Sequence, residues 1–598
     1  MCTAHHSLID PKQTDYFKRL DLLCAKCGQA LRAGYITSSG ASPEPACSEV
    51  SNSDRETDKK YHPDHFTCSI CPTVFGQNDS YYEHNDQVYC HFHYSTRCAA
   101  RCASCHSAIL KQYVEINRNS RDETYHPECY MISKFWNVKL APARPSSAPP
   151  LHEEEEKRFT PTALREFQRK MDGMVHRIWT VLSAFEESSA ACISDMLRFV
   201  SDGSYLDAVR SAERFIFHVE VLLAALDDIH HLYVSRDAVR AFSYARESRM
   251  LCRKTVDLFT SLSNAQKETS RQGMTQELLA LITGIAHFLK ILIRIALLGA
   301  LKLQREYPEP EGVSRFLDPL QRMAEENGDP TARRLVDSPR PPSSYTSKPS
   351  SEVSIQISIS VSTHEPRQSP STKGVIFGFK SLAPELAGVS PCIQEYNDAR
   401  DGTAEAAKYT PPSDLCLKCQ ETIEDDCVRL GTFLRWHAWC LTCVECGRAA
   451  GSRPTVREKA MMGNGNGDGE DGDDGSHDGH EHRHTPTPGA SATPSTPLAQ
   501  PSLAEHYVYH PEGGVGSPQA NGLLLAIGKP PSAIYCPDHR MPDAEKGFHS
   551  VTRLEQYAFL LTVALRRLYF ILKRRGAIVP PTGEPLLHPV FNQADQCV

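Results

Sequence analysis

Residues 61–71 read YHPDHFTCSIC and hold four metal-ligating side chains in two close pairs. His62 and His65 form the first pair, and Cys68 and Cys71 form the second. A two-residue spacer lets a tight turn point both side chains of a pair at one ion, and a structural zinc site takes four Cys or His ligands. Each pair therefore needs a second pair from elsewhere in the chain.

The missing pairs flank this stretch and have the same spacing. One predicted zinc site comprises Cys24, Cys27, His62 and His65. The next comprises Cys68, Cys71, Cys90 and His93. Only two residues separate the last ligand of the first site from the first ligand of the second, so one short segment of chain connects the two zinc sites. At position 65 the alternative is a bystander histidine on the hairpin.

The pattern returns twice more along the chain. A complete set near the C-terminus comprises Cys416, Cys419, His437, Cys440, Cys443, Cys446, Cys536 and His539. Its closing pair lies far along the chain, which is tolerable because a long loop adds little closure entropy per residue. An incomplete set comprises Cys102, Cys105, His126 and Cys129. After Cys129 no further close pair follows, so this module is expected to hold one zinc.

The segment YMISKFWNVKL, residues 130–140, stands where the incomplete module would carry its second half. Its apolar side chains are Phe135, Trp136, Val138 and Leu140. We expect them to cover the exposed side of the zinc ribbon. The helical part of the chain would then dock here and replace the missing half structurally.

The predicted ligands number twenty and specify about five zinc ions per chain. Every site consists of Cys and His alone, so we expect zinc to fold the modules and to do no chemistry. The other cysteines stay unassigned, at positions 2, 47, 98, 192, 252, 392, 427 and 597. Cys47 is interpreted as a free surface residue, and Cys427 as a buried hairpin residue.

Composition narrows the class of protein further. The chain has 598 residues, 22 cysteines and a net charge of −8. Paired cysteines without an apolar leader are typical of metal sites in an intracellular protein. The overall charge and the lack of a basic recognition helix argue against nucleic-acid binding.

The fold class predicted is multidomain, with small zinc-ribbon β modules and an α-helical bundle joined by long disordered linkers. The first module spans 22–97 and the incomplete one 100–140. The later boundaries are a linker over 141–158, a helical bundle over 159–305, a mostly disordered linker over 306–413, a third module over 414–542 with a low-complexity insertion at 451–530, and an amphipathic helix over 549–576. Within the long linker, apolar and polar residues alternate over 353–361, as in a β-strand. This stretch is interpreted as a lone edge strand or as a docking segment.

Three further patterns resemble functional motifs but have plainer explanations. The apolar stretch 277–306 is interrupted by His287, Lys290 and Arg294, which share a helix face, so a buried bundle helix is favoured over a membrane span. HEHRH at 480–484 lies among Gly, Asp and Pro, where the helix that a metalloprotease motif needs is not expected. GLLLAIGKP at 522–530 has the wrong length for a phosphate-binding loop.

The ligand patterns resemble the LIM domain, which consists of two fused zinc ribbons. The order of the segments resembles fungal LIM-domain Rho GTPase-activating proteins. It comprises two LIM modules, of which the second is halved and ends in ECYMISKFWNVKL, then helices, a long linker and a third LIM module. The stretch GFHSVTRLEQYAFLLTVALRRLYFIL after the third module adds to this resemblance. His65, where Cys is usual, and the long loop before His62 depart from the LIM pattern.

The resemblance implies a part in Rho-type GTPase signalling. Such proteins carry an arginine finger in a loop like G-x-x-R-x-S-G. The sequence shows no such loop, so the expectation is a chain without the catalytic domain and without enzyme activity. We expect a cytoplasmic LIM scaffold that binds Rho-pathway proteins, concentrated at sites of polarised growth, with no nucleic-acid partner and no membrane span. The alternative is the N-terminal part of a truncated Rho GTPase activator, with the bundle as a spacer or an autoinhibitory element.

Overall fold

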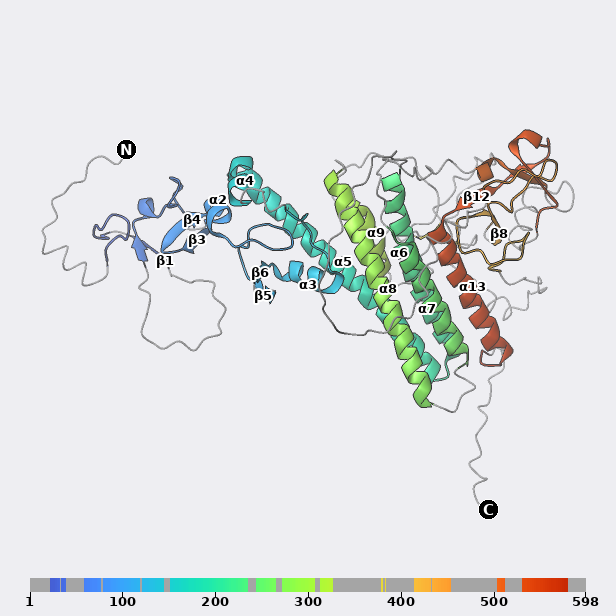
Figure 1. The fold of residues 1–598 in the computed structure, drawn as a ribbon. Helices are drawn as coiled ribbons and strands as arrows, with labels where there is room; N and C mark the ends of the chain where they lie inside the picture. The colour runs from blue at the N-terminus through green and yellow to red at the C-terminus, as the bar shows by residue number, and fades with distance from the viewer. Residues whose placement is uncertain are drawn as a thin grey trace, which may run out of the picture. The chain divides into compact units, whose positions relative to one another are not determined.

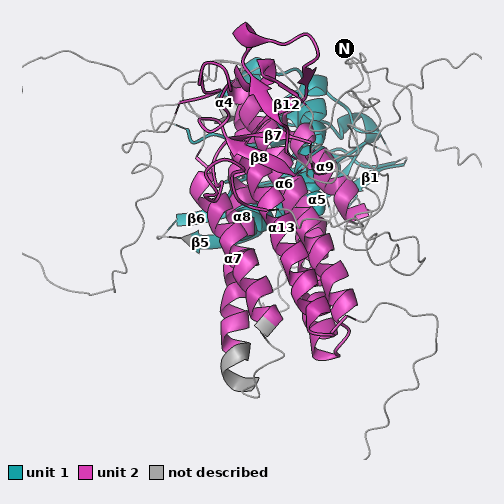
Figure 2. Cartoon of the chain, turned by 90° about the vertical axis from the view of Figure 1, so that its right-hand side faces the viewer, with its two compact units in different colours: residues 1–181 teal, residues 182–598 magenta. Residues whose placement is uncertain are grey.

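The computed structural model describes residues 22–32, 34–38, 59–76, 79–118, 121–144, 151–234, 243–264, 271–306, 312–325, 378–379, 382, 413–431, 433–452, 503–510 and 530–578. The chain divides into two compact units, residues 1–181 and 182–598 (Figure 2). Both units combine small β modules with α-helices, which confirms the predicted multidomain class. The strand pattern at 353–361, the motifs HEHRH and GLLLAIG, and Cys47 lie outside the described residues.

The first unit begins with short antiparallel hairpins, as expected for zinc ribbons. The pairs are β1 (Ile36–Ser38) with β2 (Lys59–Tyr61), β3 (Tyr81–His84) with β4 (Gln87–Cys90), and β5 (Val114–Arg118) with β6 (Arg121–Tyr125). Short helical turns follow the hairpins at η1 (Pro63–His65), α2 (His91–His93) and η2 (Tyr94–Cys98). The core of the first module is small, with Phe66 and Phe75 in T-shaped contact at its centre.

The segment 141–158 was predicted to be a linker, but its acidic half is helix α4 (Leu151–Arg158). Consecutive glutamates of α4 pair with arginines around the first two modules. Arg101 Nη1 lies 2.7 Å from Glu155 Oε2, and both side chains are largely buried. Arg97 pairs with Glu156, and Arg144 pairs with Glu154, and both of these ion pairs are more exposed. The acidic run therefore anchors a helix, because its charges have specific partners.

The second unit contains a bundle of long helices. Helix α5 (Pro161–Ser201) begins in the first unit and ends in the second. The other helices are α6 (Tyr205–Val234), α7 (Ala245–Asn264), α8 (Arg271–Glu306), α9 (Gly312–Glu325) and α13 (Arg553–Arg574). Helix α8 packs against α6, α7 and α9, and α13 packs against α6 and α7 (Figure 1). Apolar faces at helical spacing form this core, as in α6 with Phe215, Val219 and Leu222.

The bundle extends beyond the predicted limits of 159–305. Helix α9 lies in the segment predicted as mostly disordered linker and buries Phe316, Leu317 and Leu320. Helix α13 was predicted as a separate amphipathic helix over 549–576, but it is part of the bundle. It starts with a cap in which Thr552 accepts a hydrogen bond from the Glu555 N–H at 3.3 Å.

The third module has two small sheets. One has the order β10 (Ala533–Tyr535), β9 (Val508–His510), β11 (Glu545–Lys546). The other has the order β12 (Phe548–Val551), β7 (Cys427–Leu430), β8 (Leu434–His437). Strand β9 and the preceding turn η5 (Leu503–His506) lie within the predicted insertion 451–530, so residues 503–510 of that segment belong to the folded ribbon. The last turn, η6 (Pro537–His539), carries the closing ligands.

Candidate metal centres

The structure brings all twenty predicted ligands together in five groups of four. In every group the ligand atoms lie within 4.8 Å of one another. The groups are Cys24, Cys27, His62 and His65; Cys68, Cys71, Cys90 and His93; Cys102, Cys105, His126 and Cys129; Cys416, Cys419, His437 and Cys440; and Cys443, Cys446, Cys536 and His539. They are called sites 1 to 5 in this order.

The spacing of the ligand atoms fits tetrahedral zinc. Zinc bonds of about 2.0–2.3 Å place the four ligand atoms roughly 3.3–3.8 Å apart. In site 1, Cys27 Sγ lies 3.5 Å from His62 Nδ1, and His62 Nδ1 lies 3.3 Å from His65 Nδ1. In site 5, Cys446 Sγ and Cys536 Sγ are 3.7 Å apart. The donor atoms and their separations therefore suit zinc, as the sequence predicted.

A common backbone turn shapes four of the five Cys-x2-Cys pairs. The residue after the second cysteine has a positive φ, at Gly28, His106, Gln420 and Gly447. Its N–H donates to the carbonyl of the first cysteine, for example from Gly28 to Cys24 at 2.8 Å. This turn points both thiols to one side. Glycine at 28 and 447 is the expected residue for such a conformation, whereas nothing in the sequence marks His106 or Gln420.

Position 65 belongs to site 1. His65 Nδ1 lies 3.6 Å from Cys24 Sγ, on the same side as the Nδ1 atom of His62. The turn η1 between the two histidines begins with Pro63, whose fixed φ suits the first helical position. The alternative of a bystander histidine would place the ring away from the other three ligands, and the structure does not do so.

The backbone of the ribbons favours the thiolate form of Cys24 and Cys68, the first cysteines of sites 1 and 2. Burial by itself would raise the pKa of Cys24, but hydrogen bonds from backbone N–H groups of neighbouring ligand residues lower it to about 6. The same balance lowers the pKa of Cys68 to about 6. Thiolates are the form that binds zinc, so these turns lower the proton competition for the site.

Site 3 belongs to the halved module and is covered by a helix instead of a second ribbon. Pro127 starts helix α3 (Pro127–Trp136), which carries Cys129. Trp136 is 2% exposed, and its ring centroid lies 5.7 Å from that of Trp179 on α5. Phe135 contacts Trp179 as well, at 5.8 Å. Phe135 and Trp136 of the segment 130–140 therefore pack against α5, in the part of that helix that belongs to the first unit, as the apolar residues of the segment suggested.

A backbone carbonyl orients His126, the histidine of site 3. His126 Nε2 lies 3.3 Å from the carbonyl oxygen of Ala108 and donates to it when Nδ1 faces the ligand group. Such a partner fixes the ring and its tautomer. The N–H of Ala141 donates to the Ser104 carbonyl at 2.7 Å. The chain after α3 is thereby fastened to the first turn of the ribbon.

Site 4 is tied to helix α13 through buried polar groups. Gln556 of α13 accepts a hydrogen bond from Arg435 Nη1 at 2.8 Å and donates from Nε2 to the Ile423 carbonyl at 3.0 Å. Arg435 is 1% exposed, and its guanidinium lies over the ring of Phe559 at 3.7 Å. Strand β12 meanwhile occupies the edge of β7, with Val551 opposite Cys427. Cys427 is buried in this hairpin, as predicted.

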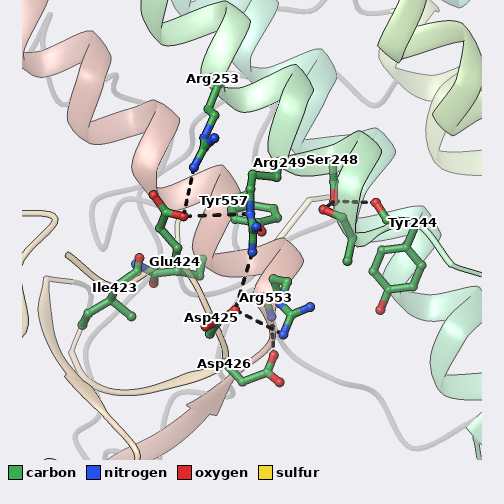
Figure 3. A network of polar contacts seen from close by, with 12 residues as sticks. Tyr244, Ser248, Arg249, Arg253, Ile423, Glu424, Asp425, Asp426, Arg553 and Tyr557 are labelled. Atoms are coloured by element: carbon green, nitrogen blue, oxygen red, sulfur yellow. Dashed lines mark hydrogen bonds and ion pairs between the residues drawn. The ribbon is translucent and has the colours of Figure 1, made fainter. Parts of the chain in front are cut away.

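An acidic loop of the third module, Glu424–Asp426, meets arginines of α7 and α13 (Figure 3). Arg253 lies 3.6 Å from Glu424, and Arg553 lies 3.2 Å from Asp425. The backbone N–H of Arg553 donates to Asp426 Oδ1 at 2.7 Å. Arg249 of α7 donates to the Tyr557 hydroxyl and lies close to the same loop. The third module is therefore part of the helical unit and not a free appendage.

One described helix has the length and composition of a membrane span. The part of α8 over Gln276–Glu306 has an 18-residue window of mean hydropathy 2.0, of which 28% is buried. An apolar core helix passes the same test, and Leu292, Ile293 and Leu297 of α8 are fully buried. The expected absence of a membrane span stays a prediction.

Comparison with known proteins gives consistent results. The LIM domain family model matches residues 46–98, the part of the first module from the loop before His62 to just beyond His93. Rho-type GTPase-activating protein 1 of Schizosaccharomyces pombe is 35% identical over 435 residues, which are 73% of this chain and 30% of that protein. Rho-GTPase-activating protein LRG1 of Saccharomyces cerevisiae is 28% identical over 333 residues, 51% of this chain and 30% of that protein.

A third relative shares a shorter stretch. LIM domain-containing protein C4F6.12 of Schizosaccharomyces pombe is 30% identical over 117 residues, which cover 20% of this chain and 22% of that protein. No solved structure matches the chain. The chain spans less than a third of the length of the two GTPase-activating relatives. The chain thus contains a segment that matches the LIM domain family and five zinc-type ligand clusters, and it is similar to fungal Rho-type GTPase-activating proteins over part of their length.

Proposed function

We propose that the chain is an adaptor of Rho-type GTPase signalling, in which zinc-stabilised LIM modules on a helical frame bind other proteins of the pathway. The observation that carries this proposal is the alignment with Rho-type GTPase-activating protein 1 over 73% of the chain. The metal clusters support a binding role, because each holds four protein ligands and leaves no position for a reacting water.

The test measures binding and catalysis with the same purified proteins. The full chain would be titrated into a panel of Rho-type GTPases, each loaded with GDP or with a non-hydrolysable GTP analogue, and into the catalytic domains of GTPase activators. An adaptor binds at least one of these proteins and leaves the rate of GTP hydrolysis unchanged. Accelerated hydrolysis by the chain alone would show an enzyme and overturn the proposal.

A second candidate follows from the partial coverage of the relatives. The matched region is 30% of each GTPase-activating relative, so the chain is also suited to be the regulatory region of a larger activator. In that case, the chain added to the separately purified catalytic domain of such an activator should change its rate of GTP hydrolysis. An adaptor would bring the two proteins together without changing that rate.

The proposal includes a location. A protein of this pathway is expected in the cytoplasm, concentrated at sites of polarised growth. A fluorescent fusion of the chain, compared with a Cys24→Ser/Cys416→Ser variant whose first and third modules cannot hold all their zinc, tests this expectation. Diffuse fluorescence of the unmodified chain throughout the cell would contradict it.

A further inference from the structure

A short segment between α9 and the third module is seated on helix α6. Of this region the structure describes Gly378, Phe379 and Leu382. Phe379 and Leu382 are 8% and 7% exposed, and the Leu382 N–H donates to the Phe379 carbonyl at 3.1 Å. This bond brings the backbones of Phe379 and Leu382 together, and both apolar side chains are buried.

The receiving surface contains a buried acid. Glu220 of α6 is 1% exposed and lies among the buried residues Phe217, Val219 and Val221. A carboxylate in such a place is costly unless it is hydrogen-bonded. Glu220 Oε1 accepts the backbone N–H of Phe379 at 3.0 Å. The acid therefore recognises the main chain of the segment.

The fit between the segment and Glu220 requires glycine. Gly378 has a φ of +82°, and a Cβ atom at this position would lie 2.5 Å from Glu220 Oε1. Any other residue would strain the backbone at this φ and would force the Glu220 carboxylate to move. A main-chain hydrogen bond, a required glycine and two apolar anchors are the elements by which proteins recognise short peptides.

We propose that the surface of α6 around Glu220 is a peptide-recognition site for the sequence pattern Gly-Phe-x-x-Leu, and that Gly378, Phe379 and Leu382 occupy it as a tethered ligand. A tether raises the local concentration of the segment, so a modest intrinsic affinity keeps the site occupied. A partner protein with the same pattern competes for the site only when it exceeds this local concentration. The inference does not depend on the Rho pathway.

The test empties the site and refills it with a free peptide. The double variant Phe379→Ala/Leu382→Ala removes both anchors and leaves α6 unchanged. A fluorescent peptide of residues 374–386, GVIFGFKSLAPEL, is titrated into the full-length variant and into the unmodified chain, with anisotropy as the readout. We expect saturable binding to the emptied variant and at least tenfold weaker apparent binding to the unmodified chain, because its own segment competes.

Two further variants test the geometry. A peptide with Gly378→Ala should bind at least tenfold more weakly, because its Cβ would meet the carboxylate. The full chain carrying Glu220→Ala, Phe379→Ala and Leu382→Ala together should lose the peptide, whereas Glu220→Gln in place of Glu220→Ala should retain part of the binding through its Oε1 acceptor. No saturable binding to a folded emptied variant, or equal binding of both peptides, would overturn the proposal. An emptied variant that fails to fold would also overturn it, because the segment would then be an obligate part of the core.

Discussion

His65 is the ligand at which this chain departs from the usual LIM pattern. We expect His65→Ala to lower the zinc content from five to four per chain, because three remaining ligands cannot close site 1. His65→Cys should keep all five, because a thiolate is an equally good zinc ligand. Zinc is measured by atomic emission after gel filtration. His84→Ala, at the exposed end of strand β3, is the control. Five zincs in His65→Ala would mean that His65 is a bystander.

Asp426 joins the third module to the start of α13, and its side chain keeps contact with solvent. The surrounding protein partly desolvates the carboxyl and raises its pKa, with Asp425 and Asp227 adding to the shift and Arg553 opposing it. A carboxyl whose pKa is raised on folding binds its proton more tightly in the native state. Its contribution to stability therefore rises as the pH falls through the folded-state pKa, and the ionised group costs stability above that value.

The upward shift of the Asp426 pKa leads to a prediction for Asp426→Asn. The amide keeps an acceptor for the Arg553 N–H and removes a charge whose ionisation the fold disfavours, so we expect the free energy of unfolding at about pH 7 to change by less than ~0.5 kcal/mol. Asp426→Ala loses the acceptor and should cost about 0.5–1.5 kcal/mol. Urea unfolding with zinc in excess measures both variants. Equal losses for the two would contradict this view of the site.

At the scale of elements, a mutation of Trp179 tests whether helix α5 replaces the second half of the incomplete module. It contacts both Phe135 and Trp136 of α3. Because Trp179 is only half-buried, Trp179→Ala should cost roughly 2–3 kcal/mol, less than a fully buried tryptophan. It should also speed the loss of zinc from site 3 to a chelator. Phe167→Ala on the same helix is the matched control, since Phe167 is an exposed aromatic residue. Equal chelation rates would show that α5 does not support the site.

The elements also show what a sequence can predict and what it cannot. The zinc ligands were predictable because each pair is local, with two residues between partners. Helix α9 carried a readable signal, since Val313, Phe316, Leu317 and Leu320 are spaced as one helical face, but the Pro-rich residues that follow obscured it. Strand β12 has only four residues, FHSV, and pairs with a strand more than a hundred residues earlier. No local pattern could reveal that pairing.

At the scale of the whole molecule, the third module and the bundle share a core. Gln556 of α13 bonds to residues on both sides of the β7–β8 hairpin, and β12 extends the sheet of that hairpin. Zinc at site 4 holds the same hairpin, because His437 ends β8 and Cys440 follows it. Binding energy of zinc at site 4 should therefore stabilise the docking of α13, since the two depend on one folded hairpin.

This coupling predicts different effects for two zinc-site mutations in one module. Cys416→Ser breaks site 4 and should sharply reduce the hydrogen-exchange protection of α13 and of the α6 and α7 surfaces that it covers. Cys443→Ser breaks site 5, whose ligands make none of the described hydrogen bonds to α13, and should lower protection mainly in β9 and β10. Gln556→Ala, which keeps every zinc ligand, should reproduce the loss in α13 in part, because Arg435 and the Ile423 carbonyl lose a partner. Full protection of α13 in Cys416→Ser would show that the bundle holds this helix without the metal.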